Sequence, residues 1–333
     1  MDDGITITLD NRELLPGICG ANDGNLRIIE GSLGGFITAR GNEIRIEGVG
    51  ETGVRRFRTM MDNLITVVKE GENPSPEYVR ALAGSLAAPA DETLEPQYQE
   101  TCSSEQKDAA FFRDSMIQIP HGFHRVYPRT TNQAKYIQGM RETEICFCIG
   151  PAGTGKTFLA IAQALHLVLS KKMRKMVLTR PVVEAGENLG FLPGDLSQKI
   201  DPYLRPLYDA MDSLVPYDVI QRLEETRAIE IAPLAYMRGR SLNECMVILD
   251  EAQNTTKEQM KMFLTRIGTG ARAVITGDAT QIDLPRKTDS GLLHAREILK
   301  GIEGLHFSFL HTADVARNPL VKKIIQAYNE SET

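Results

Sequence analysis

A glycine-rich loop that ends in a lysine and a threonine is the stretch of this chain best suited to chemistry. Its residues fit the pattern GxxxxGK[ST] at each fixed position and are Gly150, Pro151, Ala152, Gly153, Thr154, Gly155, Lys156 and Thr157. In this pattern, backbone N–H groups surround a β-phosphate, the lysine reaches the β- and γ-phosphate oxygens, and the threonine hydroxyl is offered to Mg²⁺. We therefore predict a triphosphate-binding loop; a glycine turn without a ligand is the alternative.

The residues on either side of the loop predict the elements that position it. An apolar run, 145–149, precedes the loop, and a stretch rich in alanine and leucine, 158–165, follows it. This order predicts a buried strand, the loop and then a helix whose N-terminus adds a partial positive charge at the phosphates.

A pair of acidic residues follows a second apolar run. Residues 245–249 predict a buried strand, and Asp250 and Glu251 come directly after it. Downstream of a phosphate loop, Asp250 is placed to hold Mg²⁺ through its water shell, and Glu251 to take a proton from the attacking water or to orient it. A capping box, Thr255 with Glu258, predicts that a helix begins soon afterwards.

Two residues farther along the chain are candidates to act on the γ-phosphate. The strand predicted over 271–276 is followed by Gln281, which we expect to sense the γ-phosphate and to position water. Asn318 as N-cap and Pro319 as first helical residue place Arg317 on a loop. There Arg317 would act as an arginine finger, or it is an ordinary surface arginine.

Upstream of the loop, Gln133 is a candidate to bind the base of the nucleotide. Its amide supplies a donor and an acceptor, the pair that an adenine edge needs. The alternative is an exposed glutamine in the first turn of a helix. The phosphate loop itself contacts phosphates rather than the base, so it does not distinguish ATP from GTP.

A second predicted strand, 175–180, leads into a segment with several glycines and prolines, 184–194, and then the run 201–206. Loops at the C-terminal ends of strands line the ligand crevice of an open α/β sheet. Arg180 and this insertion therefore lie where a nucleic-acid strand or a neighbouring subunit could contact the site; a plain surface insertion is the alternative. The basic segment 237–240, with Arg238 and Arg240, is a candidate phosphate contact.

The composition is that of an ordinary soluble protein. Hydrophobic residues make up 42%, charged residues make up 25%, and the formal net charge is −6. No apolar run approaches the length of a membrane span, and the N-terminus lacks a signal-peptide pattern, so we expect a cytoplasmic protein. The five cysteines form no CxxC pair and are interpreted as reduced core residues. His121 and His124 share a predicted loop, where two solvated histidines are favoured over a metal pair.

The N-terminal part predicts a small α/β module. An alternating run, 5–9, precedes a helical patch at 26–29, two strands around a hairpin signal at 40–42, and a helix over 52–69. The order resembles a KH-like RNA-binding module, with residues 20–24 in place of the GXXG loop. Three residues separate the glycines, Asp23 among them, so RNA binding and a protein-contact role both stay open. We predict domains at 1–85 and 116–333, joined by a linker, 86–115.

Together these motifs resemble the PhoH-like ATPase family, whose core is similar to the first RecA-like domain of superfamily 1 helicases. The segments that carry the resemblance are 130–133, 150–157, 179–181, 187–194, 237–240, 249–254, 276–278 with Gln281, and 314–315 with Arg317. The family more often has histidine at the position of Asn318.

The resemblance implies an α/β fold: a RecA-like P-loop NTPase with a mainly parallel sheet flanked by helices, plus the KH-like domain. It also implies ATP and Mg²⁺ as cofactors, a homo-oligomer with a hexameric ring as one form, a link to RNA metabolism, and in some members an endoribonuclease partner. No membrane partner is expected.

Three functions are compatible with these motifs. A Mg²⁺-dependent ATPase that drives RNA-linked remodelling agrees with all of them. A nucleotide-gated RNA-binding or assembly factor with little hydrolysis is the second. A full helicase is disfavoured because only about eighty residues follow Glu251, too few for a second RecA-like domain.

Overall fold

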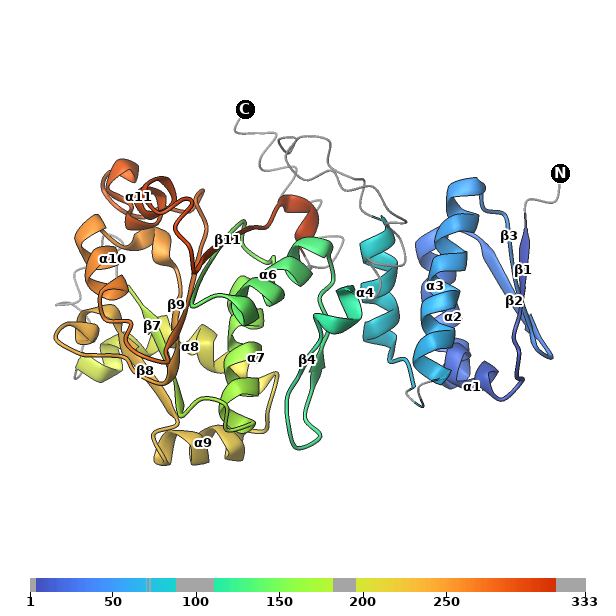
Figure 1. The fold of residues 1–333 in the computed structure, drawn as a ribbon, viewed down its shortest axis with the longest axis horizontal. Helices are drawn as coiled ribbons and strands as arrows, with labels where there is room; N and C mark the ends of the chain where they lie inside the picture. Colours follow the sequence, from blue (N-terminus) through green and yellow to red (C-terminus); the bar gives the residue numbers. More distant parts are fainter. Residues whose placement is uncertain (1–3, 70, 72, 88–110, 182–195, 316–333) are drawn as a thin grey trace. The chain divides into compact units, whose positions relative to one another are not determined.

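Two compact units make up the computed structural model, which describes residues 4–69, 71, 73–87, 111–181 and 196–315. The first unit combines residues 1–116 with 127–134, and the second combines 117–126 with 135–333 (Figure 1). Most of the predicted linker, 86–115, lies outside the described residues, as does the segment 184–194.

The first unit is the small α/β module that the N-terminal pattern predicts. Its elements are β1 (Ile5–Thr8), α1 (Leu14–Cys19), α2 (Gly24–Leu33), β2 (Phe36–Arg40), β3 (Glu43–Glu47), α3 (Glu51–Lys69) and α4 (Pro76–Ala87). The strands form an antiparallel sheet in the order β1-β3-β2, and the β2–β3 hairpin turns at Gly41 and Asn42, as predicted. Helices α2 and α3 cover one face of this sheet (Figure 1).

The loop between α1 and α2 stands at the surface of this unit. Residues 21–23 form one 3-10 turn, in which Asn22 and Asp23 have left-handed backbone angles and exposed side chains. Its base is fixed by buried Asn25, whose amide donates to the carbonyls of Ile18 (3.2 Å) and Pro74 (3.1 Å). The predicted strand, helical segment, hairpin and helix follow one another in this unit, and the left-handed backbone at Asn22 and Asp23 accommodates the extra loop residue.

The second unit is built around a six-stranded parallel sheet. Its strands are β6 (Ile145–Ile149), β7 (Lys175–Arg180), β8 (Ile229–Pro233), β9 (Cys245–Leu249), β10 (Arg272–Gly277) and β11 (Leu305–Phe309). They lie in the order β11-β6-β10-β9-β7-β8. One strand, β10, therefore separates the strand before the phosphate loop from the strand before the acidic pair, as in RecA-like cores. This order confirms the predicted fold class.

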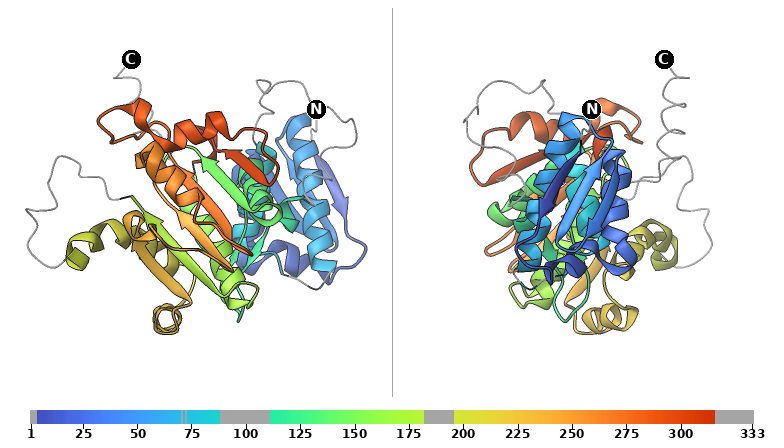
Figure 2. Two further views of the ribbon diagram at one scale, coloured as in Figure 1. Left: turned by 60° about the vertical axis from the view of Figure 1, so that its left-hand side comes forward. Right: turned by 90° about the vertical axis from the view of Figure 1, so that its right-hand side faces the viewer.

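Helices cover both faces of this sheet. They are α6 (Thr131–Glu142), α7 (Lys156–Leu169), α8 (Leu196–Asp212), α9 (Tyr217–Glu225), α10 (Lys257–Leu264) and α11 (Gly291–Ile298). Cys146 and Cys148 of β6 share a core cluster with α7, whereas Phe147 and Ile149 share one with α10 and α11. This alternation follows from the two-residue period of a strand, and Figures 1 and 2 show the two helical layers.

Several local predictions need correction. The run 201–206 lies within helix α8 instead of in a loop, and the edge strand β8 was not predicted. The capping box of α10 lies one residue later than predicted, because Thr256 is the N-cap and pairs with Gln259. A short hairpin, β4 (Ile117–Gln118) with β5 (Arg125–Val126), holds the predicted histidine loop at its turn.

The described cysteines are buried thiols. Cys19, Cys146, Cys148 and Cys245 are free, and Cys102 lies outside the described residues. Burial raises the pKa of Cys19 to about 11 and the pKa of the Cys148 thiol well above its ordinary value, so both stay protonated. Among the residues described, no group of three His, Cys, Asp or Glu is arranged to hold a metal ion, and no helix is long and apolar enough to cross a membrane.

Candidate functional site

The phosphate loop connects β6 to α7 and has the backbone that its sequence requires. Gly153 and Gly155 adopt left-handed angles, with φ of +82° and +84°, which a side chain would strain. Gly155 is the N-cap of α7, so the first N–H groups of that helix face the loop. The hydroxyl of buried Thr154 donates to the Pro151 carbonyl at 2.8 Å and closes the turn.

Lys156 is the first residue of α7 and is only 9% exposed. Its ammonium group donates to the carbonyls of Gly150 (2.6 Å) and Pro151 (2.8 Å). Burial lowers the pKa of Lys156 below the ordinary lysine value, and the nearby Asp278 and Glu251 oppose part of this shift. The loop thus holds a desolvated cation at its centre, which is the charge that a triphosphate needs.

Thr157 and Asp250 meet although they lie 93 positions apart in the chain. The Thr157 hydroxyl donates to Asp250 Oδ1 at 2.6 Å, and the hydroxyl of Thr276 on β10 donates to the same oxygen at 2.7 Å. The Asp250 backbone N–H donates to the Thr179 carbonyl at 2.9 Å, which fixes the residue beyond the end of β9. A hydroxyl and a carboxylate oxygen that converge in this way are hard ligands of the kind that Mg²⁺ prefers.

Glu251 has a left-handed backbone, with φ of +52°, which is uncommon for a residue with a side chain. Its carboxylate is contacted on both oxygens. The guanidinium of Arg180 lies 3.0 Å from Oε1, and the amide of Gln253 donates to Oε2 at 2.6 Å. The predicted base is therefore held in one orientation by a residue from β7 and by one from its own turn.

Asp278 is buried beyond the end of β10 and contacts the phosphate loop directly. Its Oδ2 accepts a hydrogen bond from the Ala152 backbone N–H at 3.0 Å, and its Oδ1 accepts one from the Thr280 hydroxyl at 2.6 Å. The Asp278 backbone N–H in turn donates to Gln253 Oε1 at 3.0 Å. Gln253 thus links Glu251 to Asp278, and Asp278 links this network to the apex of the loop.

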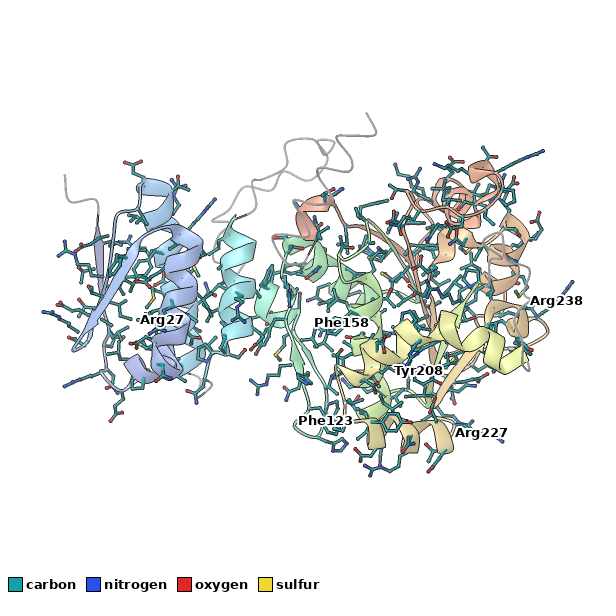
Figure 3. All side chains as sticks on the ribbon, turned by 180° about the vertical axis from the view of Figure 1, so that it is seen from behind. Arg27, Phe123, Phe158, Tyr208, Arg227 and Arg238 are labelled. Carbon is teal, nitrogen blue, oxygen red and sulfur yellow. The ribbon has the colours of Figure 1, made fainter. Side chains whose placement is uncertain are left out.

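These residues surround one cavity of about 300 Å³ in the second unit. The loop and α7 contribute Ala152, Gly153, Gly155, Lys156, Thr157 and Phe158, the last of which is labelled in Figure 3. The strand ends contribute Asp250, Glu251, Asp278 and Gln281, whose side chain is exposed. The structure therefore brings together most of the predicted catalytic, phosphate-binding and metal-binding residues.

Other predicted site residues lie elsewhere. Arg240 does not line the cavity but forms an ion pair with Glu230 on β8, and exposed Arg238 extends away from the surface in Figure 3. Neither arginine of the basic segment therefore lines the phosphate cavity, and its contact with phosphate stays a prediction. Arg317 lies outside the described residues.

Gln133 lies in the first turn of α6 and belongs to the first unit by its contacts. It is 3% exposed, so the alternative of an exposed glutamine is wrong. Its Oε1 accepts a hydrogen bond from the Arg129 backbone N–H at 2.6 Å, which fixes the amide. Its contact with an adenine stays a prediction.

Comparison with known proteins identifies the family. The sequence model of the PhoH-like protein family matches residues 125–329, which include the loop and the acidic pair. The chain belongs to the PhoH-like family.

Relatives extend the match to nearly the whole of this PhoH-like chain. A PhoH-like protein of Bacillus subtilis is 43% identical over 97% of the chain and 96% of its own length. A PhoH-like protein of Mycobacterium bovis is 44% identical over 96% of the chain and 86% of its own length. Protein PhoH of Escherichia coli is 40% identical over 61% of the chain and 58% of its own length. The solved structure of the Pif1 helicase of Candida albicans shares 16% identity over 54% of this chain and 39% of its own length, with a TM-score of 0.28.

The sequence patterns did not predict the contacts that three members of this PhoH-like site make. Asp278 follows a buried strand just as Asp250 does, and this signal could have marked it as a site residue. Gln253 lies in the acidic motif but was not given a contact. Arg180 was expected to lie where a nucleic-acid strand or a neighbouring subunit could contact the site, and its pairing with Glu251 was not predicted. The contacts of Arg180 with Glu251 and of Gln253 with Asp278 join the ends of different strands, so they depend on the strand order.

Proposed function

We propose that this PhoH-like protein is a Mg²⁺-dependent NTP hydrolase that uses ATP. The observation that carries the proposal is the contact of Thr157 with Asp250 at 2.6 Å, on the wall of a cavity that also holds Lys156 and Glu251. Thr157 and Asp250 would hold the Mg²⁺, which supplies charge neutralisation at the phosphates. Lys156 binds phosphate oxygens, and Glu251 accepts the proton of the attacking water.

The link to RNA is the less direct part of the proposal. It is supported by the KH-like order of elements in the first unit and by the exposed loop at residues 21–23. Assembly into a homo-oligomer and action alongside an endoribonuclease are further proposals that the family resemblance supports.

Two substitutions separate nucleotide binding from hydrolysis. Lys156→Ala should weaken ATP binding by about 100-fold, because charge-assisted hydrogen bonds to phosphate are lost. Glu251→Gln should keep ATP binding and lower turnover by about 10²- to 10⁴-fold, because the general base is removed. Calorimetry with ATP and with GTP, together with phosphate release, measures both effects.

The matched controls are Lys175→Ala and Glu258→Gln. Lys175 pairs with Glu230, and Glu258 lies exposed on α10; neither residue lines the phosphate cavity. Both variants should bind and hydrolyse ATP as the wild type does. Unimpaired hydrolysis in Glu251→Gln would reject the assignment of the base, and absence of any triphosphate binding by the folded wild type would reject the function.

One observation favours a second function, a nucleotide-gated RNA-binding or assembly factor with little intrinsic hydrolysis. Both carboxylate oxygens of Glu251 are already engaged, by Arg180 and by Gln253. Each contact occupies one of the positions at which these oxygens can accept a proton, so fewer positions remain for the proton of the attacking water. ATP binding without turnover, in the presence and absence of RNA, would support this second function.

A further inference from the structure

A cavity of about 430 Å³ lies in the second unit, at the edge of the parallel sheet opposite to the phosphate loop. Arg272, the first residue of β10, lines this cavity, whereas Gly277, the last residue of the same strand, lines the phosphate cavity. Its other walls come from the last turn of α6, the second half of α7 and the turn that follows α7. The two cavities share no lining residue, so a ligand could occupy this one independently of a nucleotide.

The charge in this cavity has one sign. We call it the basic cavity because three of the described residues that line it are lysine or arginine, namely Arg141, Lys172 and Arg272, and none of them is Asp or Glu. The nearby acidic residues Glu142 and Glu144 do not line it. Cations that share a cavity repel one another, and a bound anion would replace this repulsion by attraction. The basic cavity is therefore matched to an anionic ligand.

Arg272 is held in place by one of its guanidinium nitrogens. Its Nη1 donates to the carbonyls of Met140 (3.2 Å) and Arg141 (2.6 Å) at the end of α6. Its Nη2 and Nε make no hydrogen bond within the described part of the chain. These N–H groups can donate to two oxygens of one phosphate group, and the guanidinium loses little freedom on binding because Nη1 is already fixed.

Gln163 is a buried polar residue in the wall of the basic cavity. It is 2% exposed, and its Oε1 is buried without a hydrogen-bond partner among the described residues. Its neighbours in α7, Ala162 and Ala164, are buried and apolar. A buried polar atom without a partner costs free energy, so an amide at this position is unfavourable unless a ligand contacts it. A hydroxyl group of a ligand would donate to this oxygen.

The lining favours a small molecule over a strand of nucleic acid. A volume of about 430 Å³ falls within the range of small-ligand sites, about 300–1,000 Å³. Proteins that bind single strands combine a basic groove with aromatic side chains on which bases stack. No Phe, Tyr or Trp is among the described residues that line the basic cavity. Its apolar part is formed by Leu167 and Met173, which suit an aliphatic carbon skeleton.

We propose that the basic cavity binds a small phosphate monoester that also carries a hydroxyl group, such as a sugar phosphate. The three cations bind the phosphate group, and Gln163 accepts a hydrogen bond from the hydroxyl. This site is separate from the proposed nucleotide site and does not depend on hydrolysis. Inorganic phosphate and the backbone of nucleic acid share part of the ligand's chemistry, so the experiment includes both.

The experiment measures binding to the full chain by calorimetry, with ribose 5-phosphate, ribose, inorganic phosphate and oligouridylate as probes. Ribose 5-phosphate should bind about fivefold more tightly than inorganic phosphate, because it forms one more hydrogen bond, and ribose should not bind. Lys172→Ala should weaken the binding of ribose 5-phosphate by about five- to tenfold, because a charge-assisted contact is lost. The matched control is Lys171→Ala: Lys171 is the exposed neighbour and does not line the cavity, so this variant should bind as the wild type does.

Gln163→Met separates a role in binding from a role in the fold. Methionine is also long and unbranched but lacks the amide oxygen, so this variant should bind ribose 5-phosphate about fivefold more weakly. The midpoint of denaturant unfolding should stay the same or rise, because a buried atom without a partner is removed. A variant that is less stable than the wild type and binds ribose 5-phosphate normally would make Gln163 a structural residue and overturn its assigned role.

Other outcomes would overturn the site itself. They are a folded wild type that does not bind ribose 5-phosphate, and binding that Lys156→Ala abolishes, because the probe would then occupy the phosphate loop. Equal affinity for inorganic phosphate would reject the monoester, and tighter binding of oligouridylate that Lys172→Ala weakens would assign the cavity to nucleic acid. Failure of the proposed function is distinct, because it concerns triphosphate binding at the loop, which Lys172→Ala should leave unchanged.

Discussion

Lys156 carries a charge in surroundings that disfavour it. The side chain is 9% exposed, and burial lowers its pKa below the ordinary lysine value. Bound phosphate groups would reverse this shift, since nearby negative charge stabilises the protonated form. The pKa of Lys156 should therefore be lower in the free protein than in the complex with nucleotide, and binding should be linked to proton uptake.

The first prediction at the residue scale follows from the direction of this pKa shift. Below the pKa of the free protein, Lys156 is already protonated and affinity is highest. As the pH rises through that pKa, binding must first protonate the lysine, so ATP affinity falls, and it does so below the pH expected for an ordinary lysine. Calorimetry between about pH 7 and 10, in buffers of different ionisation enthalpy, measures both the affinity and the proton uptake.

Lys175→Ala is the control for this prediction, because Lys175 pairs with Glu230 and does not line the cavity. This variant should keep the wild-type pH dependence. An affinity that stays constant over this pH range, with no proton uptake, would contradict the role of Lys156.

Residue identities were predictable where spacing along the chain decides them. Lys156 and Thr157 follow from the loop pattern, and Asp250 and Glu251 follow from their place after a buried strand. The contact of Gln253 with Asp278 was not predictable, because it requires β9 and β10 to be neighbours, and a local pattern does not give the strand order. The same reason explains why Arg180 was not paired with Glu251.

At the scale of elements, the loop depends on how closely β6 approaches its neighbours. The Gly150 N–H donates to the Gly277 carbonyl on β10 at 3.1 Å, and the Leu310 N–H donates to the Ile149 carbonyl at 2.8 Å. A Cβ on Gly150 would lie 2.5 Å from the Leu310 carbonyl oxygen, which is backbone and has no rotamer to change. Strand packing thus requires the first glycine of the loop, independently of its proposed role at phosphate.

Gly150→Ala should therefore lower the free energy of unfolding by about 1–3 kcal/mol, the usual cost of overpacking a closely packed site. It should also weaken ATP binding, because the end of β6 and the start of the loop must shift. The same change at Gly31 is the control: Gly31 lies in α2, and an added Cβ would meet nothing within 4 Å.

Gly31→Ala should leave stability unchanged or raise it by up to about 1 kcal/mol, as expected for alanine in a helix interior. Denaturant unfolding checks both variants. Equal stability of Gly150→Ala and the wild type would show that β11 does not constrain the loop.

The strands that surround the site were predicted well, and those at the edges were not. β6, β7, β9 and β10 are continuous apolar runs because helices bury both faces. β8 is an edge strand whose residues after Ile229 are only partly buried, so its pattern is weaker. The one-residue error at α10 arose because Thr255 and Thr256 are both suitable caps.

At the scale of the whole molecule, the described site lacks an arginine that could neutralise charge on the γ-phosphate. Lys156 is the one Lys or Arg among the described residues that line the phosphate cavity. Arg180 is paired with Glu251 and does not line the phosphate cavity. An arginine finger would therefore have to come from outside the described lining of the cavity, and Arg317 is the residue that the family resemblance marks for this role.

We expect Arg317 to act on the site of a neighbouring subunit, which makes hydrolysis depend on assembly. Specific activity of the wild type should then rise steeply with protein concentration. The decisive measurement mixes two inactive variants, Arg317→Ala and Glu251→Gln. In a mixed oligomer, an Arg317→Ala subunit keeps its own Glu251 and receives Arg317 from its Glu251→Gln neighbour, so hydrolysis is partly restored.

Each variant alone, at the same total concentration, is the control. If both variants assemble but the mixture stays as inactive as its components, Arg317 acts on the site of its own chain or takes no part in catalysis. Recovery that increases with the fraction of mixed neighbours requires that the two residues of one active site come from two chains, because no other arrangement lets two damaged subunits compensate each other.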